Sequence, residues 1–512
     1  MMTEQKPNFD LVRNLQNGEH IADVITPEMI QGWKRGHKIL ITANTGAGKT
    51  YFIMNTLYHM CKNNKRRMLF LTNRIWLKEQ LISLYGEQVE DVITLMNYQS
   101  LINYIKFQRN KIEGIYDLIV SDEAHYFFND SIFADETDVP LNYLINETDK
   151  ELVVFLSATS QTLEDYFNQK TEHKLNFKYK ITKPYVFKDY YYWNSFDVIK
   201  KFLTELPKDE KAIYFSKNIN RALEFHHDFP NNSSFICAQG NKRFGDKCDM
   251  DTLKQLKENE KFNKQILFTT NVIENGININ DPQLKHIIID IYDFDTIIQC
   301  IGRRRIRDGE ELPNIYIRQV KQSAVSTVIN NTNFKLKPLE YFRSHNNEEF
   351  NKKYGSKNLH GLLYTESIES NQNISKYVVN AAKEFKYKHD LKIAEEINDT
   401  DTKLGHLILF CRYMQIDFLN FKDLSSYYTE ISLEDKFNYY LDRPLFGDEK
   451  TNFVELLKKE VLKPLKGGYK VITVNDYFKD IQLPYYIISE KENRRTDEHY
   501  GKRYWLLKFK VA

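Results

Sequence analysis

Short, wholly apolar runs alternate with amphipathic stretches through about the first 320 residues of the chain. Strands of this kind, placed between helices, are typical of a parallel sheet that is buried on both faces. The amphipathic stretches include Tyr51–Cys61 and Ile75–Tyr85, which we expect to be helices. The first set of predicted strands comprises Lys38–Ala43, Met68–Thr72, Val92–Met96, Leu118–Ser121 and Leu152–Ser157.

A second set of predicted strands repeats the pattern after a break. The break is Gln169–Trp193, which is rich in Lys, Tyr and Phe and weakly periodic, and we place a domain junction there. Two α/β units in tandem explain the pattern better than one very large sheet does. The second set comprises Ala212–Ser216, Ser234–Cys237, Gln265–Thr269, His286–Ile291 and Asn314–Arg318.

The alternation stops after about Gln322. We expect the polar segment Asn330–Asn351 to be loop-like. Helices are expected at Tyr377–Ile397, His406–Phe421 and Phe453–Leu462.

The last part of the chain begins with a predicted turn at Gly467-Gly468. The segment Lys470–Ala512 is expected to contain a short strand, a helix and two strand-like runs, around Tyr485–Ser489 and Arg503–Lys510. Helices followed by a strand hairpin outline a small α+β module of the winged-helix kind.

Composition narrows the class of protein. Of the 512 residues, 42% are apolar and 28% are charged, which excludes a disordered chain. No apolar run approaches the ~18 residues of a membrane-spanning helix, and Met1–Phe9 lacks the apolar core of a signal peptide. We therefore expect a cytoplasmic protein with no membrane partner. The five cysteines have no metal-site spacing, so no zinc or iron–sulfur site is expected.

Charge points weakly to an anionic partner. The net charge of the whole chain is only +2, but 11 Lys or Arg face 6 Asp or Glu between Leu462 and Ala512. A solvated basic face is the alternative. The stretch Tyr500–Lys510 mixes basic and aromatic residues, as either the wing of a winged helix or a terminal strand packed on its own domain would.

The strongest chemical motif is the run Ala43–Thr50, which follows a predicted strand and opens a predicted helix. Its glycines allow backbone N–H groups to surround phosphates, and the helix N-terminus adds a positive dipole end. Lys49 is expected to reach the β- and γ-phosphates, and the Thr50 hydroxyl to ligate Mg²⁺. The predicted nucleotide-binding residues in this loop are Thr45, Gly46, Ala47, Gly48, Lys49 and Thr50.

A second motif, Asp122-Glu123-Ala124-His125, directly follows the apolar strand Leu118–Ser121. Its acidic residues therefore belong to the C-terminal edge of the sheet, where ligands of open α/β sheets bind. Asp122 is expected to hold Mg²⁺ with Thr50, and Glu123 to polarise the attacking water. The two motifs together predict an NTPase.

The ordered set of motifs resembles superfamily 2 helicases and translocases of the broad DEAD/DEAH class. Segments that look like motifs of that family cover about 300 residues in the correct order. They are Thr72-Asn73-Arg74, Thr94–Leu101, Ser157-Ala158-Thr159, Lys211–Ser216, Thr269–Ile279 and Gln299–Arg303.

The resemblance implies two RecA-like domains with ATP between them, and it assigns further roles. The second domain would contribute Gln299 and the arginines Arg303, Arg305 and Arg307 to catalysis, and Gly276 and Asn278 to ATP binding. Because such arginines act from the other domain, hydrolysis would require closure of the cleft. A single strand would be gripped through its phosphates. The strand-binding candidates are Thr72, Asn73, Arg74, Ser216 and Thr270, and the coupling candidates are His125, Ser157 and Thr159.

The chain departs from the family pattern at three places. Ile306 stands where the family's sixth motif has its second arginine, so Arg305 and Arg307 are both candidates. Asn278 stands where the fifth motif often has Asp. Met29 in Thr26-Pro27-Glu28-Met29 replaces the glutamine that reads adenine.

The sequence thus predicts an α/β protein with two tandem RecA-like parallel-sheet domains, a helical region and a winged-helix-like C-terminal module. We expect the domains at residues 1–180, 181–325, 326–450 and 451–512. The predicted function is an ATP- and Mg²⁺-dependent helicase or translocase of a bacterial or phage-infected cell. Single-stranded and duplex DNA are preferred over RNA as partners, with a replication or recombination protein docking on the C-terminal region. The alternatives are a nucleic-acid-activated ATPase switch, a duplex translocase that separates no strands, and a motor subunit for a replication or nuclease partner.

Overall fold

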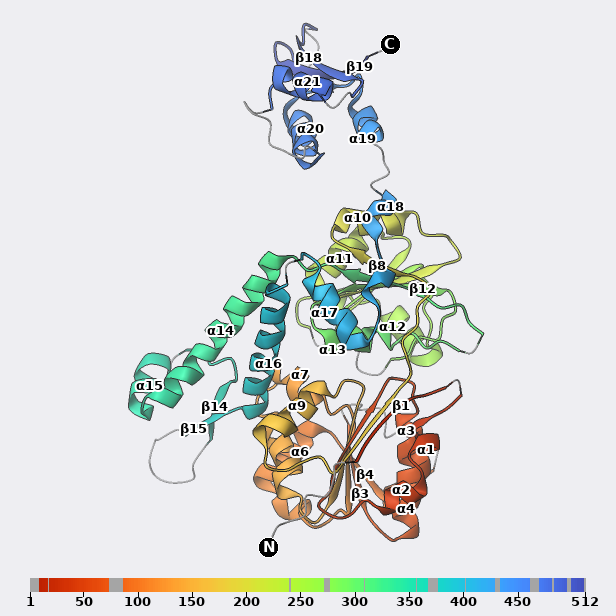
Figure 1. Cartoon of the computed structure of the whole chain (residues 1–512), viewed down its shortest axis with the longest axis vertical. Helices are drawn as coiled ribbons and strands as arrows, with labels where there is room; N and C mark the ends of the chain where they lie inside the picture. Colours follow the sequence, from red (N-terminus) through yellow and green to blue (C-terminus); the bar gives the residue numbers. More distant parts are fainter. Residues whose placement is uncertain are drawn as a thin grey trace. The chain divides into compact units, whose positions relative to one another are not determined.

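The computed structural model describes residues 9–16, 18–72, 86–238, 241–270, 277–307, 309–355, 357–366, 376–400, 402–428, 433–460, 469–480, 483–494 and 499–510. The chain divides into two compact units, Met1–Lys422 and Asp423–Ala512. The first unit contains both RecA-like domains and a set of accessory helices (Figure 1). Among the residues that the structure describes, no helix combines the length and the hydropathy that crossing a membrane requires.

The first domain is built on a seven-stranded sheet in which every neighbouring pair is parallel. In spatial order its strands are β1 (Phe9–Asn14), β7 (Phe177–Thr182), β2 (Lys38–Ala43), β6 (Leu152–Ser157), β5 (Leu118–Ser121), β3 (Met68–Leu71) and β4 (Ile93–Met96). Its helices are α1 (Ile21–Val24), α2 (Pro27–Gln31), α3 (Lys49–Phe52), α4 (Tyr58–Asn63), α6 (Tyr98–Phe107), α7 (Tyr126–Asn129), α8 (Asp138–Asn142) and α9 (Gln161–Lys170).

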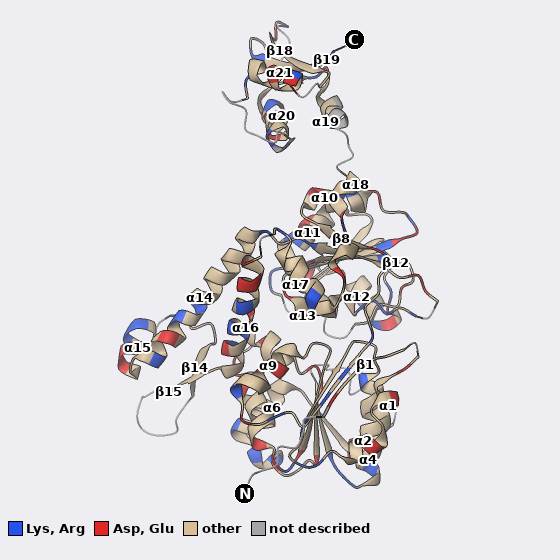
Figure 2. Cartoon of the chain, in the orientation of Figure 1, with Lys and Arg blue, Asp and Glu red and all other residues tan. Residues whose placement is uncertain are grey.

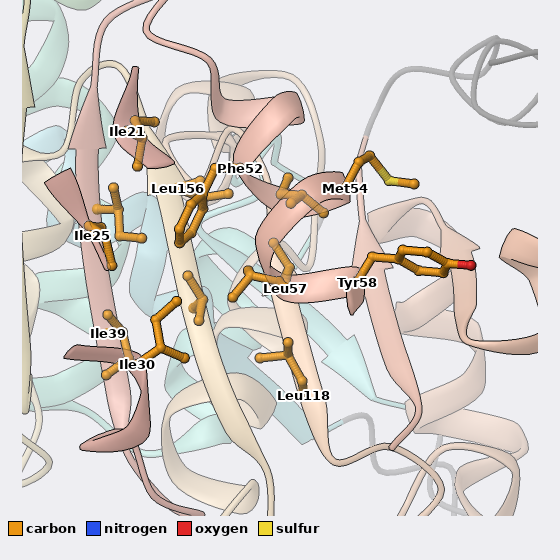
Figure 3. Packing of buried hydrophobic residues seen from close by; sticks show 14 of the residues in the cluster. Ile21, Ile25, Ile30, Ile39, Phe52, Met54, Leu57, Tyr58, Leu118 and Leu156 are labelled. Atoms are coloured by element: carbon orange, nitrogen blue, oxygen red, sulfur yellow. The ribbon is translucent and has the colours of Figure 1, made fainter. Parts of the chain in front are cut away.

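Burial on both faces explains why these strands are continuously apolar. Every residue of β3, β5 and β6 is buried. On one face the strands pack against α1 to α4, where Phe52 and Leu57 point toward the strands that carry Ile39 and Leu156 (Figure 3). A π-helical turn at Ile53–Leu57 joins α3 to α4. The opposite face forms a second core under α6 to α9.

The second domain repeats the plan. In spatial order its strands are β10 (Ser233–Ile236), β11 (Ile266–Thr269), β9 (Lys211–Ser216), β12 (Leu284–Asp290), β13 (Asn314–Arg318), β8 (Tyr190–Trp193) and β16 (Phe421–Asp423). The pairs from β10 to β8 are parallel. The helices are α10 (Phe196–Thr204), α11 (Ile219–Asp228), α12 (Met250–Asn259) and α13 (Phe294–Ile301). The predicted fold class of two tandem parallel-sheet domains is confirmed.

The accessory region follows β13. It consists of α14 (Gln322–Ser344), α15 (Asn347–Tyr354), the antiparallel pair β14 (Leu363–Glu366) and β15 (Lys376–Val379), α16 (Ala381–Asn398) and α17 (Gly405–Met414). A separate hydrophobic cluster joins α14, α15 and α16. Figure 1 shows α16 between α14 and the two RecA-like domains.

The C-terminal unit has the element order of a winged helix. It contains α18 (Leu424–Tyr428), α19 (Leu433–Tyr440), β17 (Pro444–Leu445), α20 (Gly447–Glu460), α21 (Val471–Asp480), β18 (Tyr485–Lys491) and β19 (Arg503–Phe509). The sheet order is β17-β19-β18, with antiparallel pairs. Its hydrophobic core includes Phe437 and Leu445, which precede residue 451, where we expected the last domain to begin.

Five predictions about individual elements differ from the structure in whole or in part. The segment Asn330–Asn351 lies mainly in α14 and α15, because its few apolar residues pack on α16 although most of its surface is polar. Tyr377–Ile397 begins as strand β15 before Asn380 caps α16. His406–Phe421 stops being helical at Gln415, whose φ of 56° ends α17.

The other two concern strands. The segment Gln169–Trp193 contains β7 of the first sheet and β8 of the second, two strands that the predicted sets lacked. The chain passes from one sheet to the other within this segment, where we placed the domain junction. In place of the short strand expected before the C-terminal helix, α21 begins at Val471, where Val474 and Phe478 form its buried stripe. The predicted helix Ile75–Tyr85 and the predicted turn at Gly467-Gly468 lie outside the described residues.

Candidate functional site

The loop between β2 and α3 forms a tight cradle at the C-terminal edge of the first sheet. Gly46 and Gly48 have φ angles of 90° and 84°, which glycine adopts without steric strain. A Cβ atom on Gly48 would lie 3.1 Å from Cβ of His20, so the cradle has no room for a side chain there. Such a loop at the start of a helix binds anions through its backbone N–H groups.

Lys49 is held inside this loop. Its side chain is 8% exposed, and its Nζ donates to the Ala43 carbonyl oxygen at 3.4 Å. The same Nζ lies 3.6 Å from Oε2 of Glu123. The ammonium group of the first motif and a carboxylate of the second therefore share one site.

Asp122 and Glu123 follow directly after β5. Asp122 is 2% exposed. Its backbone N–H donates to Leu71 at 2.9 Å, and its carbonyl oxygen accepts from the Tyr98 hydroxyl at 2.6 Å. Glu123 has a φ of 52°, which is uncommon for a residue with a side chain and often marks a functional site.

A divalent cation fits the donor set at this edge. The hydroxyl of Thr50 and the carboxylate of Asp122 are hard oxygen ligands, which Mg²⁺ prefers. Thr50 is the second residue of α3, and Asp122 begins the acidic motif that follows β5. The glycine cradle beside them would hold the phosphates that usually complete such a coordination sphere.

The three coupling candidates form one hydrogen-bonded chain. Nδ1 of His125 lies 3.1 Å from the Ser157 hydroxyl and 3.5 Å from Oε2 of Glu123. The Ser157 hydroxyl donates to the Thr159 carbonyl oxygen at 2.6 Å. This chain links the residues after β6 to the acidic motif.

Gln299 extends that chain into the second domain. It lies on α13 and is 6% exposed. Its side-chain amide donates to Nε2 of His125 at 2.9 Å, so two predicted site residues from different domains are in contact.

The phosphate-binding loop also contacts the residue that ends α13. The Thr45 hydroxyl donates to the Gly302 carbonyl oxygen at 3.2 Å. A Cβ on Gly302 would lie 1.9 Å from that hydroxyl oxygen, so a side chain at Gly302 would push the two domains apart.

The three candidate arginines differ in environment. Arg303 is 3% exposed, whereas Arg307 lies at the surface. Arg305 faces the loop, since a Cβ on Gly46 would lie only 2.7 Å from its Nη1. Its Nε donates to Oδ1 of Asn278 at 3.0 Å. Asn278 therefore orients the arginine that reaches the phosphate-binding loop.

A cavity of about 300 Å³ opens beside the loop. It is lined by Asn44–Gly46, by the interdomain segment Lys183–Phe187 and by the arginine-bearing turn after α13. Burial raises the pKa of Tyr185, which lies against Asn44 and Thr45. Sequence reasoning missed both Tyr185 and His20, because neither belongs to a local motif and both reach the loop through tertiary folding.

The strand-binding candidates that the structure describes are buried. Thr72 and Thr270 follow β3 and β11 and are 5% and 7% exposed. Ser216 is fully buried, and its hydroxyl donates to Oδ2 of Asp290 at 3.0 Å. The structure thus brings Ser216 into an ion-pair network around Asp290. Asn73, Arg74 and Gly276 lie outside the described residues.

Two family models match the chain over its RecA-like domains. The model for the res subunit of type III restriction enzymes matches residues 10–162, and the model for the conserved C-terminal domain of helicases matches residues 194–306. No curated protein matches the chain.

Solved structures with a similar fold are more distant. The DEAD-box helicase Mss116 bound to ssRNA is 16% identical with a TM-score of 0.42, over 58% of this chain and 69% of that one. A fragment of a putative HsdR subunit of a type I restriction enzyme from Vibrio vulnificus is 18% identical with a TM-score of 0.39, over 57% and 61%. The Type ISP restriction-modification enzyme LlaBIII bound to DNA is 16% identical with a TM-score of 0.40, over 56% and 26%.

Proposed function

Because the chain is a superfamily 2 helicase-type protein, we propose that it hydrolyses ATP between its RecA-like domains to move along a nucleic-acid strand and unwind duplex DNA. The observation that best supports this proposal is the approach of Arg305, from the second domain, to Gly46 in the phosphate-binding loop of the first. A guanidinium in that position can complete a hydrolytic site only when the two domains are together.

In the proposed reaction, water attacks the γ-phosphorus while the bond from that phosphorus to the bridging oxygen of ADP breaks. Glu123 orients the water and accepts its proton. Lys49 exchanges its contact with Glu123 for the β- and γ-phosphates, which frees the carboxylate for this role. Arg303 and Arg305 stabilise the charge that develops on the transferred group.

Thr50 and Asp122 would hold Mg²⁺, which when bound neutralises phosphate charge. Gln299 would report closure of the cleft to the first domain, since its partner His125 lies 3.5 Å from Glu123. The hydrogen-bonded chain through Ser157 and Thr159 would carry that signal along the edge of the first sheet.

Nucleic acid would be held through its phosphates by Thr72, Asn73, Arg74 and Thr270, without base reading. We drop the Ser216 side chain from this role, because its hydroxyl donates to Asp290. The backbone N–H groups of Thr72 and Thr270 donate to the carbonyl oxygens of Met96 and Ile236, so they take no part in it either. The winged-helix element order of the C-terminal unit favours DNA, because related helix–turn–helix modules bind duplex DNA.

The test compares ATP hydrolysis with strand displacement on single-stranded DNA, duplex DNA and RNA at several salt concentrations. We expect DNA to stimulate hydrolysis and the wild-type chain to displace a strand. Lys49→Ala should abolish both activities. Glu123→Gln should still bind ATP but hydrolyse it about 10²–10⁴-fold more slowly.

Two results would reject parts of the proposal. Retained hydrolysis in Lys49→Ala would refute the assigned site. Hydrolysis stimulated by duplex without strand displacement would favour a duplex translocase or an ATPase switch over a helicase.

A further inference from the structure

The accessory helix α16 contacts both RecA-like domains (Figure 1). On the side of the first domain, the Phe385 ring packs against both Phe128 and Tyr166, with ring centroids 5.9 and 5.2 Å away. Oδ1 of Asp135 lies 3.2 Å from Nζ of Lys383. These contacts fix α16 to the first domain by an aromatic core and an ion pair.

On the side of the second domain, the contact is made by Lys386. Its side chain is 3% exposed, and its Nζ lies 3.2 Å from Oδ2 of Asp293. The same Nζ lies 2.8 Å from Oδ1 of Asp390, one helical turn further along α16. Figure 2 shows that charges of both signs lie along α16, and Lys386 is the lysine that reaches α13.

Asp293 caps the helix that carries the cleft residues. Its Oδ1 accepts from the backbone N–H of Thr296 at 2.9 Å and from the Thr296 hydroxyl at 2.7 Å. The helix α13 that starts there contains Gln299, and it ends at Gly302, against the phosphate-binding loop. The other carboxylate oxygen of Asp293 thus connects this helix to α16.

The next helix of the accessory region holds the same end of α13. The Tyr413 hydroxyl, on α17, donates to Oδ1 of Asp295 at 2.6 Å. Burial favours the neutral form of Asp293, but Lys386 and Lys217 outweigh this effect and hold its pKa well below the usual value. A buried lysine is tolerated only when counter-charges and hydrogen bonds compensate for its lost hydration, as they do here.

We propose that Lys386 is a positioning residue for the ATP site: by pairing with Asp293 it fixes α13, and with it Gln299 and the arginine-bearing turn, relative to the first domain. The accessory helices thereby control how the cleft closes. This inference rests on the proposed hydrolysis of ATP between the RecA-like domains. It also predicts that a ligand or substitution that displaces α16 changes the rate of ATP hydrolysis.

The test replaces Lys386 and leaves the phosphate-binding loop intact. Lys386→Met should lower kcat by roughly tenfold to a hundredfold with little change in KM for ATP, because a misplaced α13 affects catalysis more than nucleotide binding. Lys386→Arg, which keeps the charge, should recover most of the loss. The matched control is Lys388→Met, since Lys388 lies on the same helix and pairs with Glu384, away from α13.

A second variant distinguishes loss of the Lys386–Asp293 ion pair from general unfolding. Asp293→Asn removes the charge but keeps a good N-cap for α13. It should reproduce the loss in kcat, and the double variant with Lys386→Met should lose no more than the more impaired single variant. Losses that simply multiply would overturn the proposal.

Hydrogen exchange provides a readout that needs no activity. Amides of α13 should exchange faster in Lys386→Met than in wild type or in Lys388→Met, without nucleotide. Unchanged exchange in α13, or unchanged kcat, would overturn the proposal. A wild-type chain that hydrolyses no ATP would instead reject the proposed function, and exchange would still decide whether Lys386 holds α13.

Discussion

The side-chain amide of Gln299 lies 2.9 Å from Nε2 of His125, and the two residues belong to different RecA-like domains. Since the amide nitrogen is a donor, His125 accepts through Nε2 and carries its proton on Nδ1. That proton faces the Ser157 hydroxyl and Glu123. The His125 ring therefore links Gln299 of the second domain to the carboxylate proposed as the general base.

Gln299→Leu removes this bond while nearly keeping the volume of the side chain. We expect nucleic-acid-stimulated ATP turnover to fall by about tenfold or more, because the domains lose a contact that forms only when they meet. Binding of a fluorescent ADP analogue should remain close to wild type, since the phosphate-binding loop is unchanged. The measurement is steady-state turnover with and without DNA.

The control for this change is Gln265→Leu. The Gln265 amide is a hydrogen-bond donor too, to the backbone oxygens of Leu206 and Pro207, but it lies away from the phosphate-binding loop and α13. Equal loss of turnover in both variants would mean that general destabilisation, rather than the contact with His125, is responsible.

Kinetic measurements can also decide which of the two arginines beside Ile306 acts in ATP hydrolysis. Arg305 reaches Gly46 and is oriented by Asn278, whereas Arg307 is exposed. Arg305→Ala should therefore lower kcat by roughly 10³-fold or more, the usual effect of losing such an arginine. Arg307→Ala should stay within about twofold of wild type, as expected for an exposed residue away from the site.

Arg305→Lys should recover little activity, because a lysine lacks the planar fork of donors that contacts both Asn278 and the phosphates. Turnover measured at saturating ATP distinguishes these variants. A larger loss in Arg307→Ala than in Arg305→Ala would reverse the assignment.

Some residues of the candidate site could be predicted from the sequence because their signals are local. Asp122 directly follows the buried strand β5, and Lys49 begins the helix after β2, so the local sequence alone places both residues at the same edge of the sheet. The choice between Arg305 and Arg307 could not be made in this way. It depends on the bridge between Ile279 and Arg304, which fixes the side of the turn on which each arginine lies.

The same reasoning explains the errors in the fold. Strands such as β5 are buried on both faces, so their composition identifies them without knowledge of their neighbours. In contrast, α14 is polar around most of its surface and is stabilised by packing of Leu336 and Leu339 in the accessory core. In α14, tertiary packing outweighs a weak local preference for helix. The sequence of the segment alone therefore does not predict this helix.

His389 makes the stability of the accessory contact depend on pH. Burial disfavours its charged form, but the carboxylates of Asp165 and Asp390, 3.6 and 3.9 Å from its ring nitrogens, outweigh both this effect and repulsion by Lys386, and raise its pKa from 6.5 to about 9. Because the folded-state pKa is the higher one, its stabilising contribution is complete below pH 6.5 and is lost as pH rises through about 9. The shift corresponds to roughly 3 kcal/mol.

The measurement is the unfolding midpoint of wild type and His389→Gln between pH 6 and 9.5. We expect the variant to be less stable at pH 6 and the difference to shrink toward pH 9.5. His59→Gln, at an exposed position on α4, serves as the control. A stability difference that stays constant with pH would show that His389 is not charged in the folded chain.

The strand hairpin of the C-terminal unit should act as the duplex-binding wing. Lys502 and Arg503 are exposed where β19 begins, next to exposed Tyr500. Replacing both basic residues by Gln should weaken duplex binding at every sequence and reduce the slope of log K against log salt by about 2, because each phosphate contact contributes about 0.9. Binding titrations at four or more salt concentrations measure this slope.

The control is Lys450→Gln with Lys458→Gln, which removes the same charge from α20 and should leave the slope unchanged. A larger effect from Lys479→Gln would move the duplex from the hairpin to α21, since that lysine is the basic residue in the last turn of the helix.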